Sequence, residues 1–369
     1  MNRRTTRKSL CLSLRRKHDM KTKYLTVGTN FDISQLEYFI DCNERYDEVK
    51  IDKVYGSIRS EHIGLCSARP DFRLGTADKK DFEEYVRLAL KHKIGIDYTA
   101  NALLNMPIET LHEKESSIVD LFKYLESVGV ERVIVANPLI MELITKHTSL
   151  SLKCSTILGI NSVNAIKYYA QYRVDSICPD IYINRNIPLL SDMQQECQKY
   201  GINLELLANE VCMFGDVPCN NILRTNCYIH SSLGGNPQHY FDSWPFSRCQ
   251  TARRESPSSI LKIPFILPTH IERYRQETGI SFFKISGRTN TFEYLTSTVE
   301  KYMSQTFEGP IENLFMLPQN KQHSVENSIT VEQLTEQGFF EKIFNRSNPC
   351  NYQCHKCQYC DKLYEKFRV

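Results

Sequence analysis

The sequence predicts an α/β fold, a (β/α)8 barrel of the TIM type. Three observations support it: eight short apolar runs that favour β-strands, amphipathic segments between most of these runs, and a span of about 280 residues to hold the alternating units. The chain has 369 residues, 41% of them hydrophobic, which is enough for a core of this size. A barrel of this type carries its active site in the loops at the carboxyl ends of the strands, so functional residues are expected there.

The expected elements follow one another in regular order. Strands are predicted at residues 24–28, 49–55, 94–98, 132–136, 150–155, 174–178, 203–208 and 282–286. Helices are predicted at residues 81–91, 117–128, 139–145, 163–172, 192–200, 272–278 and 291–303. Their apolar residues recur at helical spacing, as Phe82, Tyr85 and Val86 do in the first helix. A further amphipathic helix is expected at 331–346, beyond the barrel.

Charge and composition divide the chain into four parts. Residues 1–22 are expected to be a basic, disordered head: residues 1–19 carry seven Lys/Arg and one Asp, so the rest of the chain has a net charge of −3. Translation starting at Met20, a nucleic-acid-binding arm and an organelle presequence are the alternatives for this head. The barrel covers 23–303 and includes a cysteine-bearing insertion at 211–270. A linker at 304–330 leads to a helix and a cysteine-rich tail at 331–369.

The chain has 14 cysteines, and those that cluster in the sequence are expected to bind metal. No secretory signal and no apolar stretch of membrane-spanning length is found, which favours a soluble, cytoplasmic protein without membrane contact, whose thiols stay reduced. Four central cysteines read Cys212-x6-Cys219-x7-Cys227-x21-Cys249 and follow the seventh strand. Four separated thiols suit an iron–sulfur cluster or a tetrahedral zinc site, and the alternative is four unrelated buried thiols. The spacing alone does not choose the metal.

Four terminal cysteines read Cys350-x3-Cys354-x2-Cys357-x2-Cys360. Structural zinc usually takes two Cys-x2-Cys pairs separated by a longer loop, whereas tight runs of cysteine are typical of cuboidal clusters. We therefore expect a second iron–sulfur cluster here, with zinc as the alternative. The spacing imitates the radical S-adenosylmethionine motif, but that motif follows the first barrel strand, and here it closes the chain.

Two motifs carry a resemblance to a known family. The central Cys-x6-Cys follows a strand, and the eighth strand reads Phe283-Lys-Ile-Ser-Gly-Arg288. In these features residues 23–303 resemble the collagenase-like peptidases, the thirty-second family of peptidases of unknown mechanism. The family's usual strand motif is Lys-Ile-Glu-Gly-Arg, so Ser286 replaces its glutamate. The glutamate that leads the family's other strand falls at Leu204, and the nearest one here is Glu205.

The resemblance implies more than proteolysis. Some branches of the family look like oxygen-independent hydroxylases, acting in ubiquinone synthesis or on tRNA and ribosomal RNA. In them, cysteines equivalent to the central set bind a [4Fe-4S] cluster, and prephenate is implicated as the hydroxyl source. By motif, Cys212 and Cys219 carry over directly, whereas Cys227 and Cys249 lie at spacings that vary in the family. The terminal set is outside the family's common core.

Three functions follow as hypotheses. The first is an iron–sulfur-dependent enzyme for hydroxylation or a related redox modification. The second is a peptidase, although the chain lacks His-Glu-x-x-His and Gly-x-Ser-x-Gly; His112-Glu113 begins the former, but Ser116 takes the place of the second histidine. The third is a non-catalytic electron-transfer or scaffold subunit that docks through Phe339, Phe340 and Phe344, a stripe that equally suits core packing.

Four residues at strand ends are the candidates for catalysis. Arg288 and Arg185 are expected to hold an anionic small-molecule substrate, and Glu210 and Tyr98 to transfer protons; salt bridging and core packing are the alternatives. A redox protein or a homologous subunit is a candidate partner. RNA has less weight because the chain beyond its head has a net charge of −3.

Overall fold

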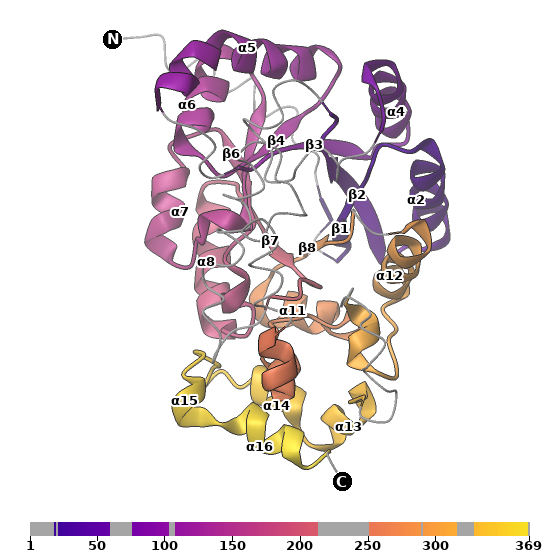
Figure 1. The fold of residues 1–369 in the computed structure, drawn as a ribbon, viewed down its shortest axis with the longest axis vertical. Helices are drawn as coiled ribbons and strands as arrows, with labels where there is room; N and C mark the ends of the chain where they lie inside the picture. The colour runs from indigo at the N-terminus through magenta and orange to yellow at the C-terminus, as the bar shows by residue number, and fades with distance from the viewer. Residues whose placement is uncertain are drawn as a thin grey trace.

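Eight parallel strands close into one barrel in the computed structural model, in the order β1 to β8 (Figure 1). The structure describes residues 18–19, 21–59, 76–102, 108–212, 251–288, 291–315 and 328–367. The strands are β1 (Lys23–Gly28), β2 (Val49–Gly56), β3 (Gly95–Ala100), β4 (Arg132–Val135), β5 (Ser151–Cys154), β6 (Val174–Ile177), β7 (Asn203–Leu207) and β8 (Phe282–Ile285). β8 pairs with β1, with Phe283 opposite Leu25, and this pairing closes the barrel. The predicted fold class is confirmed.

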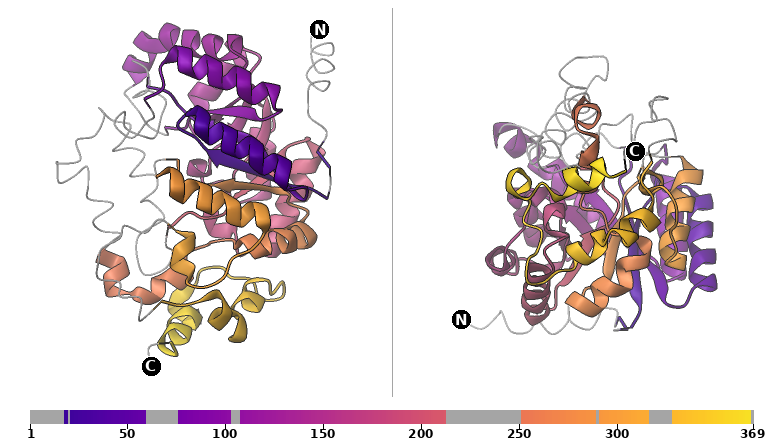
Figure 2. Two further views of the ribbon diagram at one scale, coloured as in Figure 1. Left: turned by 90° about the vertical axis from the view of Figure 1, so that its right-hand side faces the viewer. Right: turned by 90° about the horizontal axis from the view of Figure 1, so that it is seen from below.

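Helices surround the strands and cover their outer faces. They are α2 (Ile33–Arg45), α4 (Lys79–Lys91), α5 (Ile108–Ser127), α6 (Pro138–His147), α7 (Val163–Tyr169), α8 (Ile187–Lys199), α11 (Ile271–Thr278) and α12 (Phe292–Ser304). Short 3-10 helices are η2 (Thr156–Leu158), η3 (Ile181–Ile183), η5 (Pro257–Lys262), η6 (Pro268–His270) and η7 (Ile311–Leu314). The last barrel helix, α12, packs beside the first, α2, so the helical layer also closes (Figures 1 and 2).

Among the barrel helices that lie in described residues, α2 is the one that the sequence did not predict. Polar and apolar residues alternate irregularly in its sequence, and the apolar residues that it buries fully are Leu36, Phe39 and Cys42, three residues apart. Its start is defined by Asp32, whose carboxylate accepts a hydrogen bond from the Ser34 N–H. A narrow apolar stripe and a capping aspartate are sufficient here because the barrel supplies the packing surface.

The segment after the barrel folds back onto it. The helix expected at 331–346 is two helices, α13 (Val331–Glu336) and α14 (Phe339–Ile343), because Gly338 has a φ of +68° and ends the first of them. Phe339, Phe340 and Phe344 are all buried. Phe339 stacks on Phe265, and Phe340 meets the edge of His270. The hypothesis that this stripe is a free docking face is therefore wrong.

The chain closes with α15 (Cys354–Cys357) and α16 (Tyr359–Glu365), which lie with α13 at one end of the molecule (Figure 1). The described parts of 304–330 also pack rather than merely connect: Phe307, Ile311 and Leu314 are buried, and Pro310 pairs with Thr330 across a β-bridge. Among the described residues, no helix combines the length and the apolar composition needed to cross a membrane.

Candidate functional site

A polar layer crosses the interior of the barrel. Alternate strands supply Thr26 (β1), Asp97 (β3), Lys153 (β5) and Glu205 (β7), and all four are buried. The Lys153 ammonium lies 3.1 Å from Asp97 Oδ2 and also pairs with Glu205, whose Oε1 accepts a hydrogen bond from Thr26. Alternate strands normally fill such a layer with branched apolar residues. At this layer, the interior of the barrel is therefore lined by charged groups that face one another, and not by apolar side chains.

The buried charges of this layer largely neutralise one another. Arg132 extends the network, with Nε 2.8 Å from Asp97 Oδ1 and Nη1 2.8 Å from Asp175 Oδ1. Burial alone would raise the pKa of Asp97, but the cations of Arg132, Lys153 and Lys53 outweigh burial and hold that pKa below its ordinary value. The carboxylate of Asp97 is therefore ionised at neutral pH.

Lys284 lies near this network but forms no ion pair with its carboxylates. It is the next-to-last residue of β8, near the carboxyl ends of the strands, which we call the barrel mouth. Its ammonium lies 3.9 Å from the centroid of the Tyr55 ring and has no ion pair with any described carboxylate. Burial, helped by the nearby charge of Lys153, lowers the pKa of Lys284 to about 8. Lys284 is thus a partly accessible amine that titrates close to neutral pH.

Arg288 lies at the same mouth, where the sequence analysis predicted it. Its guanidinium donates to Ser57 Oγ (3.3 Å) and its Cζ lies 6.0 Å from the Tyr55 ring, so Arg288 and Lys284 flank one tyrosine. Two glycines make this placement possible. Gly287 has a φ of +131°, and a Cβ at Gly28 would lie 2.7 Å from Arg288 Cβ. The pair of cations suits an anionic group.

The structure places Tyr98 and Glu210 differently. Tyr98 packs against Phe82 of α4, with ring centroids 6.2 Å apart, because its neighbour Asp97 takes the inward position on β3. Tyr98 thus faces the helical layer, and its expected placement at the mouth is wrong. Glu210 follows β7, is partly exposed, and accepts a hydrogen bond from the N–H of Val211 (3.1 Å). Its role in proton transfer stays a prediction.

Cys212 is the one central cysteine within the described residues. It follows β7 at the mouth, is partly buried, and packs against the apolar group of Cys178, Ile181 and Leu207. Arg253 fixes the neighbouring backbone by donating to the Val211 carbonyl (2.8 Å). Cys219, Cys227 and Cys249 lie outside the described residues, so the central ligand set stays a prediction.

Arg185 lies away from the position expected for it. It is 2% exposed and donates to the carbonyls of Leu261 (2.8 Å) and Ile263. Its Cζ lies 5.4 Å from each of the Phe265 and Phe339 rings. These contacts join η5 to the terminal segment, and none of them is to Lys284 or Arg288, so the role of Arg185 in holding a substrate stays a prediction.

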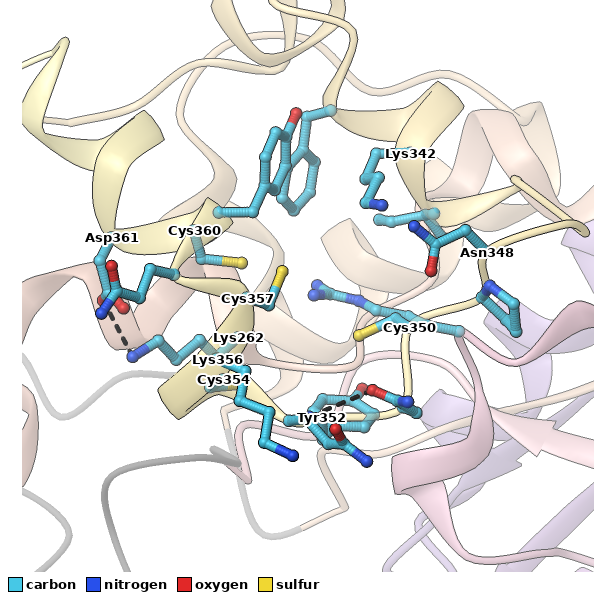
Figure 3. A pocket seen from close by; sticks show the side chains of 18 residues that line it. Lys262, Lys342, Asn348, Cys350, Tyr352, Cys354, Lys356, Cys357, Cys360 and Asp361 are labelled. Carbon is cyan, nitrogen blue, oxygen red and sulfur yellow. Dashed lines mark hydrogen bonds and ion pairs between the residues drawn. The ribbon is translucent and has the colours of Figure 1, made fainter.

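Arg185 instead lines a cavity of about 330 Å³ that is bordered mostly by the terminal segment, here called the terminal cavity. All four terminal cysteines line it too. Figure 3 shows the sulfur atoms of Cys350, Cys357 and Cys360 turned toward a common space. The structure thus brings together the four thiols that the sequence analysis expected to act together, and adds a buried cation that it did not.

The sequence analysis assigned no role to Lys153, Glu205 or Lys284, yet it held a signal for them. Each is a charged residue inside a short apolar strand: Ser-Leu-Lys-Cys, Asn-Leu-Glu-Leu-Leu and Phe-Phe-Lys-Ile. A charge at an inward position of a barrel strand must find a partner or a ligand, because an unpaired buried charge is costly. A charged residue at an inward strand position therefore marks the polar layer.

Comparison with known proteins gives consistent relatives. A model of peptidase family U32 matches residues 40–219. The chain is 24% identical over 332 residues to the uncharacterized protease MJ1657 of Methanocaldococcus jannaschii, covering 86% of this chain and 92% of that relative. Among solved structures, the U32 peptidase Mk0906 aligns with a TM-score of 0.47 and 12% identity, over 74% of this chain and 96% of the other. A mandelate racemase/muconate lactonizing enzyme from Jannaschia sp. CCS1 aligns with a TM-score of 0.36 and 11% identity, over 61% and 56%.

Proposed function

The chain belongs to peptidase family U32, and from this premise we propose that it is an iron–sulfur-dependent enzyme. It hydroxylates an anionic substrate without molecular oxygen, or carries out a related redox modification, at the barrel mouth. The observation that carries this proposal is the Lys284 ammonium, which faces the mouth without a carboxylate partner among the described residues. With Arg288 beside it, the mouth offers two cations to one substrate anion.

The expected cofactor is a [4Fe-4S] cluster held by Cys212, Cys219, Cys227 and Cys249. The described part of this set fits: Cys212 is a partly buried thiol at the mouth, on the strand end next to β8. When bound, the cluster supplies one-electron exchange or a Lewis-acidic iron. The chain itself supplies the rest: Lys284 and Arg288 hold the anion, Tyr55 keeps both cations in place, and Glu210 is the proposed proton carrier.

Peptide hydrolysis is the alternative, and one observation favours it. The relative in Methanocaldococcus jannaschii is described as a protease, and a lysine whose pKa is about 8 has the properties of a general base. Such a base needs a hydroxyl or a water to activate. Within the described part of the chain, Lys284 makes no hydrogen bond to a serine or threonine hydroxyl.

Removing the central ligands separates the two functions. Full-length protein carrying Cys212→Ala and Cys219→Ala is purified without oxygen beside the wild type and a Cys197→Ala control, a buried cysteine outside both sets. We expect the double variant to lose about four iron and four sulfide ions per chain, and the control to keep them. A double variant that has lost these four iron ions yet cleaves fluorescein-labelled casein as fast as an active wild type would refute the redox proposal.

A further inference from the structure

We propose that Cys350, Cys354, Cys357 and Cys360 bind a second [4Fe-4S] cluster in the terminal cavity, with Arg185 as its buried counter-charge. This site is separate from the barrel mouth, and all of its residues lie in the described part of the chain. It does not depend on the function proposed for the mouth. Three features support it: the space between the thiols, the charge around them, and the rigidity of the segment that carries them.

The space between the thiols suits a cluster better than a single ion. The cavity measures about 330 Å³, whereas a water molecule in the liquid occupies about 30 Å³. This volume belongs to the whole cavity, and it leaves room for a group larger than a single zinc ion, whose four thiolate ligands would stand only about 2.3 Å from it. Among the described residues, no group of three or more Cys, His, Asp or Glu side chains is already placed to hold a metal ion. Figure 3 shows the sulfur atoms of Cys350, Cys357 and Cys360 turned toward one space, and Cys354 lines the same cavity.

The charge around the thiols calls for an anion. Arg185 has two carbonyls and two aromatic rings as neighbours, but no ion pair with a described carboxylate, and its Nε has no hydrogen-bond partner among the described residues. A cation buried without a counter-ion costs several kcal/mol. Lys262 is different, because its ammonium is already paired with Asp361 (2.9 Å). A cluster with four thiolate ligands is anionic, and it would provide the charge that Arg185 lacks.

The segment that carries the thiols is held in place by its own contacts. The Tyr359 ring stacks over Phe339 at 6.3 Å, Leu363 is buried, and Asp361 binds both Lys262 and Ser258. Tyr352 and Gln358, which lie between the cysteines, take positive φ angles of 56° and 52° that non-glycine residues seldom adopt. Gln358 takes this conformation as the left-handed residue between α15 and α16, so the backbone around the cysteines is part of the folded terminal segment.

Aromatic contacts connect the cavity to the barrel. The Tyr352 ring lies 6.1 Å from that of Tyr182, which packs on the same group, Cys178, Ile181 and Leu207, that Cys212 contacts. The terminal cavity is therefore a neighbour of the carboxyl edge of the barrel. Its cysteines are nevertheless distinct from the central set.

The test uses full-length protein in which the central set has been disabled by Cys212→Ala and Cys219→Ala. It is purified without oxygen, and iron and sulfide are supplied for reconstitution. We expect about four iron and four labile sulfide ions per chain to remain, with the paramagnetic signal of a reduced cluster after dithionite treatment. Adding Cys357→Ala and Cys360→Ala should remove both. Zinc without sulfide, or no bound metal, would overturn the proposal.

A second comparison covers the case in which the central substitutions prevent folding. Cys357→Ala and Cys360→Ala are then introduced into the otherwise wild-type chain, and iron and sulfide are expected to fall by half. Unchanged iron would overturn the terminal cluster. Failure of the mouth proposal looks different: the wild type and the Cys212→Ala/Cys219→Ala protein would then contain the same iron.

Discussion

The barrel interior and the terminal cavity both bury cationic side chains, but the chain balances their charge in different ways. In the barrel, Asp97 and Glu205 pair with Lys153, and Arg132 spans Asp97 and Asp175. In the cavity, Arg185 has carbonyls and rings as neighbours, while the groups facing the same space are thiols. The first arrangement is complete without a ligand. The second becomes electrostatically complete when the thiols are ionised and bound to a metal.

This difference assigns separate roles to the buried cations. Those of the polar layer hold the barrel together, whereas Lys284, which has no ion pair with a described carboxylate, is the cation proposed to bind a substrate at the mouth beside Arg288. Arg185 is reserved for the terminal cavity. The following predictions test this division, beginning with the largest effect.

Breaking the polar layer should cause the largest loss in the free energy of unfolding. Asp97→Asn keeps the size of the side chain but leaves Lys153 and Arg132 short of a counter-ion, so the free energy of unfolding should fall by about 3–5 kcal/mol. Urea unfolding followed by circular dichroism measures it. Asp47→Asn is the matched control, because its ion pair with Lys50 is exposed and is expected to contribute far less. Equal losses in the two variants would show that the layer is not a structural unit.

Anion binding at the mouth should depend on pH through Lys284. Its pKa is about 8, below the ordinary lysine value, so the amine is cationic below pH 8 and loses its charge as pH rises. The affinity for an added dicarboxylate, with prephenate as the probe, should therefore be full below pH 8. Above it, the affinity should fall by up to about tenfold per pH unit. Isothermal titration calorimetry from pH 6 to 10 measures this.

Two variants sharpen the pH test. Lys284→Arg should bind the probe with little change across the same range, since its guanidinium stays charged, and Lys284→Met should bind weakly throughout. Hydrolysis with Lys284 as general base predicts the opposite trend, a casein cleavage rate that rises through pH 8 and then levels. Observing that rise without anion binding would move the function from redox modification to proteolysis.

The smallest predicted effect concerns the terminal cavity. Arg185→Gln removes a buried positive charge beside the cluster, which should make reduction less favourable and shift the midpoint potential to more negative values by tens of millivolts. Arg185→Lys should shift it less. Lys262→Gln is the control, because Asp361 already neutralises that lysine. Potentiometric titration of the protein with its central ligands removed measures the shift, and an unchanged potential in Arg185→Gln would refute its role.

Much of the fold could be predicted because the strands differ clearly from their surroundings. All eight strands lie where short apolar runs indicated, to within two residues at each end. Helix α2 was not predicted because it fully buries few apolar residues, namely Leu36, Phe39 and Cys42. The single helix expected at 331–346 is divided at Gly338, because the left-handed conformation of this glycine ends α13.

The candidate site could be predicted only in part. Arg288 and the segment of Cys212 could be located because the site of a barrel lies at the carboxyl ends of its strands. The close spacing of the terminal cysteines in the sequence indicated that they form one site. Tyr98 was misplaced because strand parity was not applied: once Asp97 faces inward, its neighbour faces outward. The place of Arg185 depends on a tail that folds back from much later in the chain, and no local pattern reports such a contact.

Crystals of the full-length protein grown without oxygen, with anomalous diffraction recorded on both sides of the iron absorption edge, test the central claim most directly. We expect two separate iron peaks, one in the terminal cavity among Cys350, Cys354, Cys357 and Cys360, and one at the barrel mouth beside Cys212. Anomalous signal at the zinc edge alone would contradict it, as would an iron peak at neither position.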